Sequence, residues 1–305
     1  IVMWKDVLFA GVTLLLTIEC FKLYEKRNNL KFKNLISFLI VSLIFVFLRN
    51  NAIYAYFILA LIILIIFKKY FKQFAVMFVL VFSVFIFVKG PVFKWCGIQK
   101  SSSAEYIGMP LQQVSRIITK NEKLTNNQYL QIEKLIPVSI IPSVYNPIVS
   151  DGIKFNKNFN IDAFNDDKIS YLKLYSDIII EHFQTAMEAY FISTLGYWYP
   201  NVVYWSVANN VYENNFGIYL DPKTNENINN IIVEGEKRTL PLFGMQWSIG
   251  LCVWTIAVLT VCFIKKNKFI AITSFLPCIT IWITMLLASP VWGEFRYVYG
   301  LFTSL

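Results

Sequence analysis

The feature that most constrains the fold is an apolar run over residues 35–67, which is interrupted only by Arg49, Asn50 and Asn51. Both halves of the run are rich in Ile, Leu, Val and Phe, and neither contains a charged residue. A helix needs roughly 20 apolar residues to cross the hydrocarbon core of a bilayer. The run therefore predicts two short membrane-spanning helices, joined by a tight polar hairpin at one membrane face.

Basic residues indicate which side of the membrane this hairpin faces. The short loops 22–33, 68–72 and 265–268 hold five, three and three basic residues, and the single acidic residue in them is Glu25. Positive residues concentrate in the cytoplasmic loops of membrane proteins. We therefore expect these three loops in the cytoplasm and the hairpin on the outer face.

The net charge of +9 is mostly a signal of this topology. Residues 89–244 hold 14 basic and 15 acidic residues, so the longest polar stretch is nearly neutral. A composition of 56% hydrophobic and 15% charged residues is typical of a polytopic membrane protein. Membrane lipids are thus expected partners, and no basic surface remains for nucleic acid.

The apolar segments predict an all-α protein with about six to seven transmembrane helices. Residues 1–89 would form the first four, residues 90–244 an extracytoplasmic domain, and residues 245–305 the fifth to the seventh. Pro277 predicts a kink in the sixth helix. Because the sequence begins with Ile-Val-Met and stops inside an apolar run, we expect a fragment of a larger protein whose seventh helix is truncated.

The inserted domain is predicted to be mainly helical. Apolar residues alternate with Gln112, Gln113 and Arg116 at helical spacing, which indicates an amphipathic helix beginning at Pro110. Thr125 predicts the N-cap of the next helix. Residues 170–194 read as one long helix, in which the single histidine, His182, is expected to be a packed residue.

Charged residues beside the membrane are the first candidates for function, because charge at membrane depth is costly. Arg49, with Asn50 and Asn51 beside it, could clamp a phosphate with its planar fork of donors, or could simply extend to the interface. Asp6, at the outer end of the first helix, could act as a general base or a metal ligand. The alternative for Asp6 is an ordinary flanking pair with Lys5.

Further candidates lie in the last outer loop and in the inserted domain. Glu294 and Arg296 could face a headgroup pocket, whereas the aromatic residues around them suit an interfacial belt. Gln112 and Arg116 could meet a headgroup, or could pack against their own domain. Trp198 and Tyr199 could stack on sugar rings, or could serve as core or interface anchors.

Several common enzymatic motifs are absent from the sequence. It has no P-loop, dinucleotide fingerprint, nucleophile elbow, HExxH pair or zinc-type cysteine spacing, so no metal ligands are assigned.

Five strings occurring in order carry a resemblance: WKDVLF, LRNNAIYA, GMPLQQVSRII, TLGYWYP and GEFRYVYG. Together they resemble a family of uncharacterised polytopic membrane proteins of Gram-positive bacteria. That family is grouped with multi-pass, C-type glycosyltransferases, the architecture of protein mannosyltransferases and aminoarabinose transferases. The resemblance covers nearly the whole chain and implies a bacterial plasma-membrane protein.

The resemblance further implies transfer of a sugar, with inversion, from a polyprenyl-phosphate or pyrophosphate donor to an acceptor outside the membrane. The main catalytic carboxylate of such enzymes would precede Ile1, and Asp6 would correspond to a second acidic position. Arg49 and Arg296 would hold the donor phosphate. The resemblance leaves room for a divalent cation and implies no other cofactor.

Two other function classes stay open at this point. A transporter or flippase of lipid-linked glycans would need similar outward arginines and short helices, although the large inserted domain favours an enzyme. A non-catalytic membrane assembly protein is the third reading. A multi-pass O-acyltransferase is disfavoured, because such enzymes generally use a membrane-embedded histidine and His182 lies in the inserted domain. The sequence does not define the oligomeric state.

Overall fold

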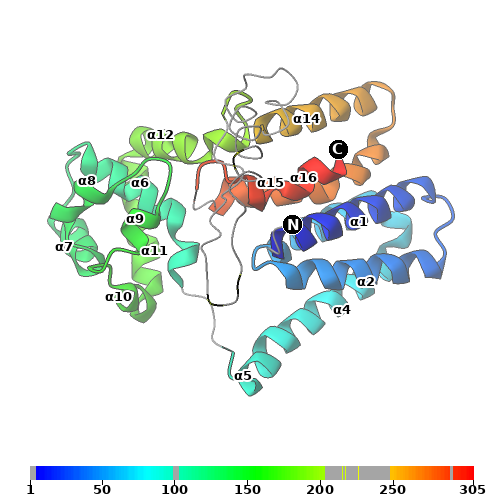
Figure 1. The fold of residues 1–305 in the computed structure, drawn as a ribbon, viewed down its shortest axis with the longest axis horizontal. Coiled ribbons are helices and arrows are strands. Elements are labelled where there is room, and N and C mark those ends of the chain that lie inside the picture. Colours follow the sequence, from blue (N-terminus) through cyan, green and yellow to red (C-terminus); the bar gives the residue numbers. More distant parts are fainter. Residues whose placement is uncertain are drawn as a thin grey trace. The chain divides into compact units, whose positions relative to one another are not determined.

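The computed structural model describes residues 5–98, 103–202, 215, 217, 226, 248–288 and 291–305. Within these ranges every regular element is a helix (Figure 1). Extended pairing is limited to two isolated bridges, Asn146–Val149 and Val149–Val291. This confirms the prediction of an all-helical protein. The predicted boundary between residues 244 and 245 lies outside the described residues.

The chain divides into two compact units. Unit 1 comprises Ile1–Phe87, Gly196–Ile283 and Gly293–Leu305, and unit 2 comprises Val88–Leu195 and Thr284–Trp292. Each unit is therefore built from segments that are far apart in the sequence. We describe the two units separately.

Unit 1 holds most of the apolar helices. Three helical segments are long and apolar enough to cross a membrane: Lys5–Glu25, Lys68–Trp95 and Phe269–Ala288. The last residues of the second and third segments belong to unit 2. Three shorter apolar helices are Lys33–Leu48, Ala52–Ile66 and Ile249–Lys265. These lengths and compositions are those of a membrane protein. The structural elements are α1 (Lys5–Glu25), α2 (Phe32–Leu48), α3 (Ala52–Ile66), α4 (Phe71–Phe87), α14 (Ile249–Lys265), α15 (Leu276–Ala288) and α16 (Tyr299–Ser304).

Aromatic side chains pack α2, α3 and α4 together. The ring of Phe38 in α2 lies 6.4 Å from that of Phe74 in α4, and the ring of Tyr56 in α3 lies 5.7 Å from that of Phe78 in α4. Phe38, Tyr56 and Phe74 are fully buried. Edge-to-face aromatic pairs of this kind add to the free energy of simple burial.

The C-terminal segment of unit 1 differs from the predicted sixth and seventh helices. A 3-10 helix, Phe269–Phe275, runs directly into α15, so Pro277 lies beside the change from 3-10 to α-helical geometry, in the first turn of α15, where proline is tolerated. Beyond α15, a short 3-10 turn, Phe295–Tyr297, leads into α16.

Unit 2 is a cluster of short helices around an isoleucine-rich core. Its helices are α5 (Phe93–Trp95), α6 (Gly108–Thr119), α7 (Asn126–Leu135), α8 (Ile141–Val144), α9 (Asp151–Lys154), α10 (Ile161–Asp166), α11 (Lys168–Glu181) and α12 (Phe183–Thr194). Ile117, Ile153 and Ile178 are completely buried in this core. The predicted cap at Thr125 is confirmed, because Thr125 and Gln128 form a reciprocal capping box.

The prediction of one helix over residues 170–194 is wrong. The chain bends at His182, between α11 and α12, where the backbone leaves helical geometry at φ −117° and ψ 40°. The imidazole Nδ1 of His182 lies 2.6 Å from Oε2 of Glu122, and the hydroxyl of Thr185 donates to Oε1 of the same carboxylate. Glu122 therefore anchors the bend from outside the two helices, which helical periodicity alone could not indicate.

The contact between α1 and α16 provides a test of the fold of unit 1. A Cβ atom added at Gly300 would lie 2.8 Å from Cβ and from Cγ2 of Thr13. We expect Gly300→Ala to lower the free energy of unfolding by about 1–3 kcal/mol, the usual cost of overpacking. In the Thr13→Gly background the obstructing atoms are absent, so the same substitution should cost much less. Thermal unfolding of the four variants measures this coupling, and equal costs in both backgrounds would contradict the packing described here.

Candidate functional site

A buried ion pair in unit 1 forms the centre of the candidate site. Nη1 of Arg49 lies 3.1 Å from Oδ1 of Asp6, and the two side chains are 10% and 9% exposed. Asp6 occupies the first turn of α1, where a carboxylate interacts favourably with the helix dipole. Arg49 directly follows α2 in an extended conformation, which turns its side chain out of the helical path.

Tyr297 contacts the guanidinium group of Arg49 with both its backbone and its ring. Nη1 of Arg49 donates to the carbonyl oxygen of Tyr297 at 3.3 Å, and the guanidinium carbon lies 4.5 Å from the centroid of the Tyr297 ring. The ring of Phe9 lies 5.6 Å away. Aromatic faces stabilise a cation, most strongly where water is excluded.

The guanidinium group of Arg49 has donors to spare. Its hydrogen bond to Tyr297 and its closest approach to Asp6 both use Nη1, and Nε and Nη2 donate no hydrogen bond within the described part of the chain. Arginine recognises phosphate through two parallel N–H groups. The geometry therefore leaves a pair of donors for an anionic ligand.

Glu294 and Arg296 join the same cluster. Oε1 of Glu294 lies 3.3 Å from Nε of Arg296, and the Glu294 carboxylate is almost fully buried. The guanidinium carbon of Arg296 lies 5.1 Å from the Tyr297 ring centroid. Two arginines therefore share one tyrosine ring, each paired with a carboxylate. Hereafter the Tyr297 cluster means Asp6, Arg49, Glu294, Arg296 and Tyr297.

The backbone around Glu294 is held by Tyr197, which sequence reasoning did not assign to the site. The amide of Glu294 donates to the hydroxyl of Tyr197 at 3.3 Å, and the indole of Trp282 donates to the Tyr197 carbonyl at 2.8 Å. A Cβ at Gly293 would lie 2.9 Å from Cα of Gly196. Residues 196–197 and 293–297 belong to two of the strings that carry the family resemblance, and this shared membership was the available signal.

The other candidates from the hairpin belong to a turn. The carbonyl oxygen of Asn51 accepts hydrogen bonds from the amides of Tyr54 and Ala55, and these bonds form the first turn of α3. Asn50 is exposed. Both asparagines therefore shape the turn that presents Arg49.

Trp198 and Tyr199 lie against the N-terminal half of α14. They are not among the contacts of the Tyr297 cluster described above. The indole of Trp254 donates to the Trp198 carbonyl at 2.9 Å. A Cβ at Gly250 would lie 2.6 Å from the Tyr199 carbonyl oxygen, so the helix packs directly on this backbone. The Tyr199 side chain is 45% exposed, whereas Trp198 is partly buried.

Gln112 and Arg116 lie in unit 2, where they contact their own unit. Gln112 is 2% exposed, and its amide donates to the carbonyl of Asn146 at 2.9 Å. The sequence pattern placed Gln112 on the polar face of its helix, but the helix is covered on that side as well. Buried amides are tolerated where they form hydrogen bonds.

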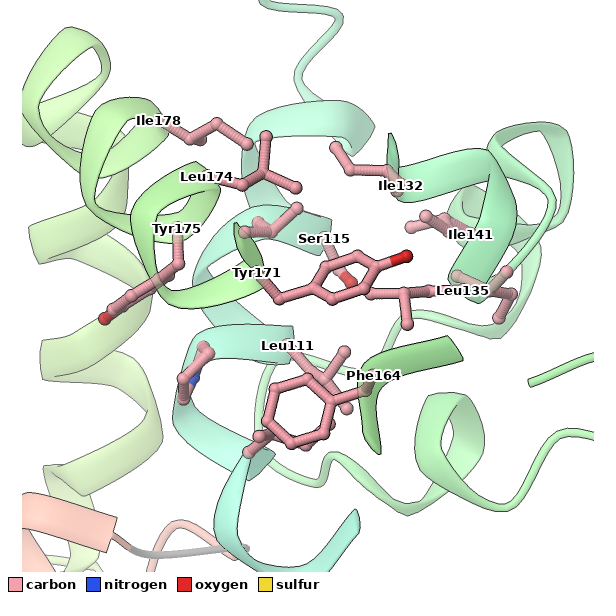
Figure 2. Close-up of a pocket in the computed structure, with 14 residues that line it drawn as sticks. Leu111, Ser115, Ile132, Leu135, Ile141, Phe164, Tyr171, Leu174, Tyr175 and Ile178 are labelled. Carbon is pink, nitrogen blue, oxygen red and sulfur yellow. The ribbon is translucent and has the colours of Figure 1, made fainter. Parts of the chain in front are cut away.

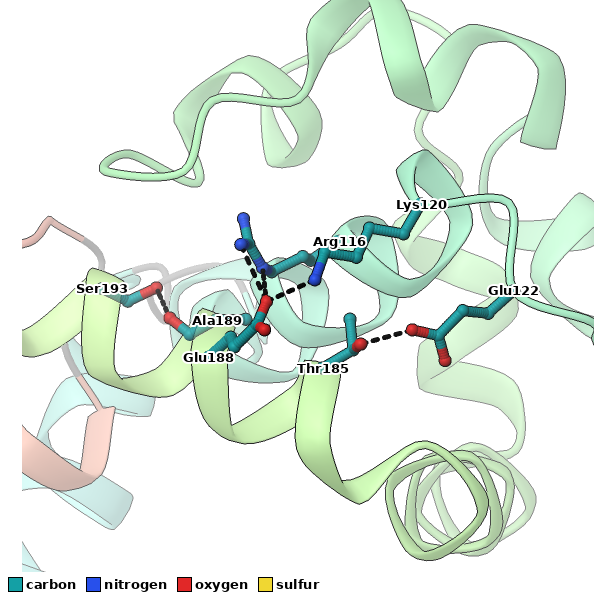
Figure 3. A network of polar contacts seen from close by, with 7 residues as sticks. All are labelled: Arg116, Lys120, Glu122, Thr185, Glu188, Ala189 and Ser193. Atoms are coloured by element: carbon teal, nitrogen blue, oxygen red, sulfur yellow. Dashed lines mark hydrogen bonds and ion pairs between the residues drawn. The ribbon is translucent and has the colours of Figure 1, made fainter.

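Arg116 is part of an ion-pair network at the surface of unit 2. Nη2 of Arg116 lies 2.9 Å from Oε2 of Glu188, and Nζ of Lys120 contacts the same oxygen (Figure 3). Two hydrogen bonds hold the pKa of the Glu188 carboxyl below its ordinary value. The one from Lys120 has the larger effect, and the one from Arg116 the smaller. Arg116 thus ties α6 to α12.

Unit 2 also encloses an apolar cavity of about 60 Å³. Figure 2 shows Leu111, Phe164, Leu174 and Ile178 around it. The described lining holds three hydroxyl groups, those of Ser115, Tyr171 and Tyr175, but no carboxylate, amine or imidazole. Among the residues that the structure describes, no group of three or more His, Cys, Asp or Glu side chains could hold a metal ion.

The chain belongs to a family of unknown function, DUF6020, whose model matches residues 1–305. No curated protein and no solved structure matches the chain. The family match extends over both units and over every residue of the Tyr297 cluster.

Charge pairing in the Tyr297 cluster can be tested by a double-mutant cycle. Removing one partner of a buried ion pair leaves an uncompensated charge and typically costs about 3–5 kcal/mol. We expect Arg49→Gln to destabilise the protein by an amount of this order. Because Asp6→Asn removes the remaining charge, the double variant should recover much of the loss. Chemical unfolding measured by tryptophan fluorescence gives the four free energies, and additive costs would refute the pairing.

The network of Glu188 predicts a pH dependence. A carboxyl whose pKa is lowered by folding stabilises the protein above its unfolded pKa of about 4.3, and this contribution is lost as the pH falls through the lower folded value. We therefore expect Glu188→Gln to lower the melting temperature near neutral pH and to have little effect at pH about 3. Asp166→Asn, which removes an exposed carboxylate without an ion pair among the described residues, is the control. An effect of Glu188→Gln that persists in acid would contradict this assignment.

Proposed function

We propose that this family member is a membrane glycosyltransferase that transfers a sugar from a polyprenyl-phosphate donor to an extracytoplasmic acceptor. The observation that carries the proposal is the buried Arg49 guanidinium, oriented by Asp6 and Tyr297, with Nε and Nη2 unused among the described residues. A fixed arginine fork beside apolar helices suits a phosphate attached to a lipid.

The proposed topology follows from the helices and the basic loops. The three long apolar helices and the three shorter ones would all cross the membrane, with α16 beginning a seventh crossing. The lysine-rich loops would lie in the cytoplasm of a bacterium. In this topology the α2–α3 turn that carries Arg49, and residues 90–244, lie outside the plasma membrane.

The proposed reaction divides the work among the members of the Tyr297 cluster. The acceptor hydroxyl oxygen attacks the anomeric carbon from the side opposite the phosphate, and the bond from that carbon to the phosphate oxygen breaks. The phosphate leaves with the bonding electron pair, and the configuration inverts because the attack comes from the opposite side. Arg49 and Arg296 stabilise its developing charge, as preorganised donors do in other transferases.

A carboxylate must accept the proton of the acceptor hydroxyl. Asp6 is the candidate in this chain, because it is the carboxylate beside the guanidinium group, with Oδ1 3.1 Å from Nη1 of Arg49. Through Oδ1 the same carboxylate holds the guanidinium group in place. Glu294 has the corresponding positioning role for Arg296.

A flippase of lipid-linked glycans is the second candidate. The same arginine cluster and the short helices α2 and α3 would serve it, because recognition of the lipid phosphate is common to both functions. A transferase releases the sugar from the lipid, whereas a flippase moves it intact. Incubation with a labelled donor therefore separates the two. A non-catalytic membrane assembly protein would do neither.

Photo-crosslinking tests donor binding. We expect purified full-length protein to be labelled by a photoactivatable polyprenyl-phosphate sugar, and natural lipid to compete. Arg49→Lys keeps the charge but loses the fork, and Arg296→Ala removes the second cation. Each should reduce labelling at a given probe concentration, by about tenfold if a charge-assisted hydrogen bond is lost.

Arg27 provides a matched control. Its guanidinium carbon also lies over a tyrosine ring, 4.7 Å from the centroid of Tyr24, and Nη1 donates to the Tyr24 carbonyl at 3.0 Å. Arg27→Ala should leave labelling unchanged. Wild-type protein that is folded but shows no competable labelling would exclude both the transferase and the flippase.

A further inference from the structure

A second open space in unit 2 has a lining quite different from that of the apolar cavity. It is a groove of about 470 Å³ between α7 and α11, two helices of the same unit (Figure 1). Eight of its ten lining side chains are polar, and the apolar pair is Leu174 and Ile180. Ligand sites usually span about 300–1,000 Å³ and are mostly apolar, so this polar lining is unusual.

The two walls of the groove are held together at one end. The amide of Gln128 donates to Oε2 of Glu181 at 2.8 Å, while its carbonyl oxygen accepts from the backbone of Thr125. Gln128 is only 5% exposed. This buried amide thereby joins the first turn of α7 to the last turn of α11, and the spacing of the walls is fixed before any ligand binds.

Leu174 forms the floor of the groove and separates it from the apolar cavity. It lines both spaces and is 8% exposed, and Figure 2 shows its side chain at the apolar cavity. The apolar core on one side and the polar groove on the other are therefore distinct compartments. A polar ligand in the groove would rest on a packed base.

Several polar groups in the groove have hydrogen-bonding capacity to spare. Lys173 and Asp177 make no hydrogen bond or ion pair with the residues that the structure describes. The amide of Gln131 makes one long contact, 3.5 Å, with Asn127. The groove therefore presents ammonium donors, carboxylate acceptors and amides, which can do both.

We propose that this groove binds a neutral sugar unit. Vicinal hydroxyl groups donate and accept together, which matches the mixed lining of amides, carboxylates and one ammonium group. The lining holds two carboxylates, Asp177 and Glu181, against the single ammonium group of Lys173, so an anionic ligand is disfavoured. Ile180, at 76% exposure, offers an apolar surface to the C–H face of a sugar ring. The proposal does not depend on donor binding at Arg49.

Saturation-transfer NMR on the detergent-solubilised full-length protein tests this inference. The probes are the neutral trisaccharides maltotriose, cellotriose and triacetylchitotriose. At least one should give a saturable signal from its ring protons. The double variant Lys173→Met/Asp177→Asn removes two charged groups of the lining that are exposed to solvent, and should weaken binding at least about tenfold.

Controls separate groove binding from weak surface association. Asp166→Asn, an exposed carboxylate outside the groove, should retain wild-type affinity. Arg49→Lys should also retain it, so that failure of the donor proposal leaves this result interpretable. Absence of binding by all three trisaccharides, unchanged affinity in the double variant, or saturable binding of spermidine or glucose 1-phosphate in their place would overturn the proposal.

Discussion

The ion pair between Asp6 and Arg49 is the constraint on which the arrangement of unit 1 depends. Charges removed from water are costly, and they persist where each has a partner and further contacts. Here Arg49 meets a carboxylate from α1 and both the carbonyl and the ring of Tyr297. Three stretches that are distant in sequence, around Asp6, Arg49 and Tyr297, are therefore held together through one guanidinium group. The same contacts immobilise the fork that the proposed function requires.

Charges beside apolar segments singled out Asp6, Arg49, Glu294 and Arg296 in the sequence, and all four lie in the Tyr297 cluster. Their meeting point could not be predicted, because hydropathy says nothing about which helices are neighbours. Tyr297 was expected in an interfacial belt on composition alone. The local signals were reliable where the cause was local, as in the capping box of Thr125.

Periodicity failed where tertiary contacts decide. Gln112 has a polar side chain at an apparently exposed position, yet it is buried, and its Nε2 group donates to the Asn146 carbonyl. The expected helix over residues 170–194 bends at His182 because Glu122, about sixty residues earlier in the sequence, contacts both His182 and Thr185. Neither partner lies on the same element, so neither contact leaves a trace in local sequence.

The two units offer different chemistry. Unit 1 combines apolar helices with a fixed cluster of arginines and carboxylates, whereas unit 2 combines an isoleucine core with a polar groove. We propose that Arg49 binds a lipid-linked phosphate, and a cryo-EM structure of the full-length protein with a bound polyprenyl phosphate tests this most directly. The account predicts phosphate density within hydrogen-bonding distance of Nε and Nη2 of Arg49. Density at another site, with those two nitrogens unoccupied, would contradict it.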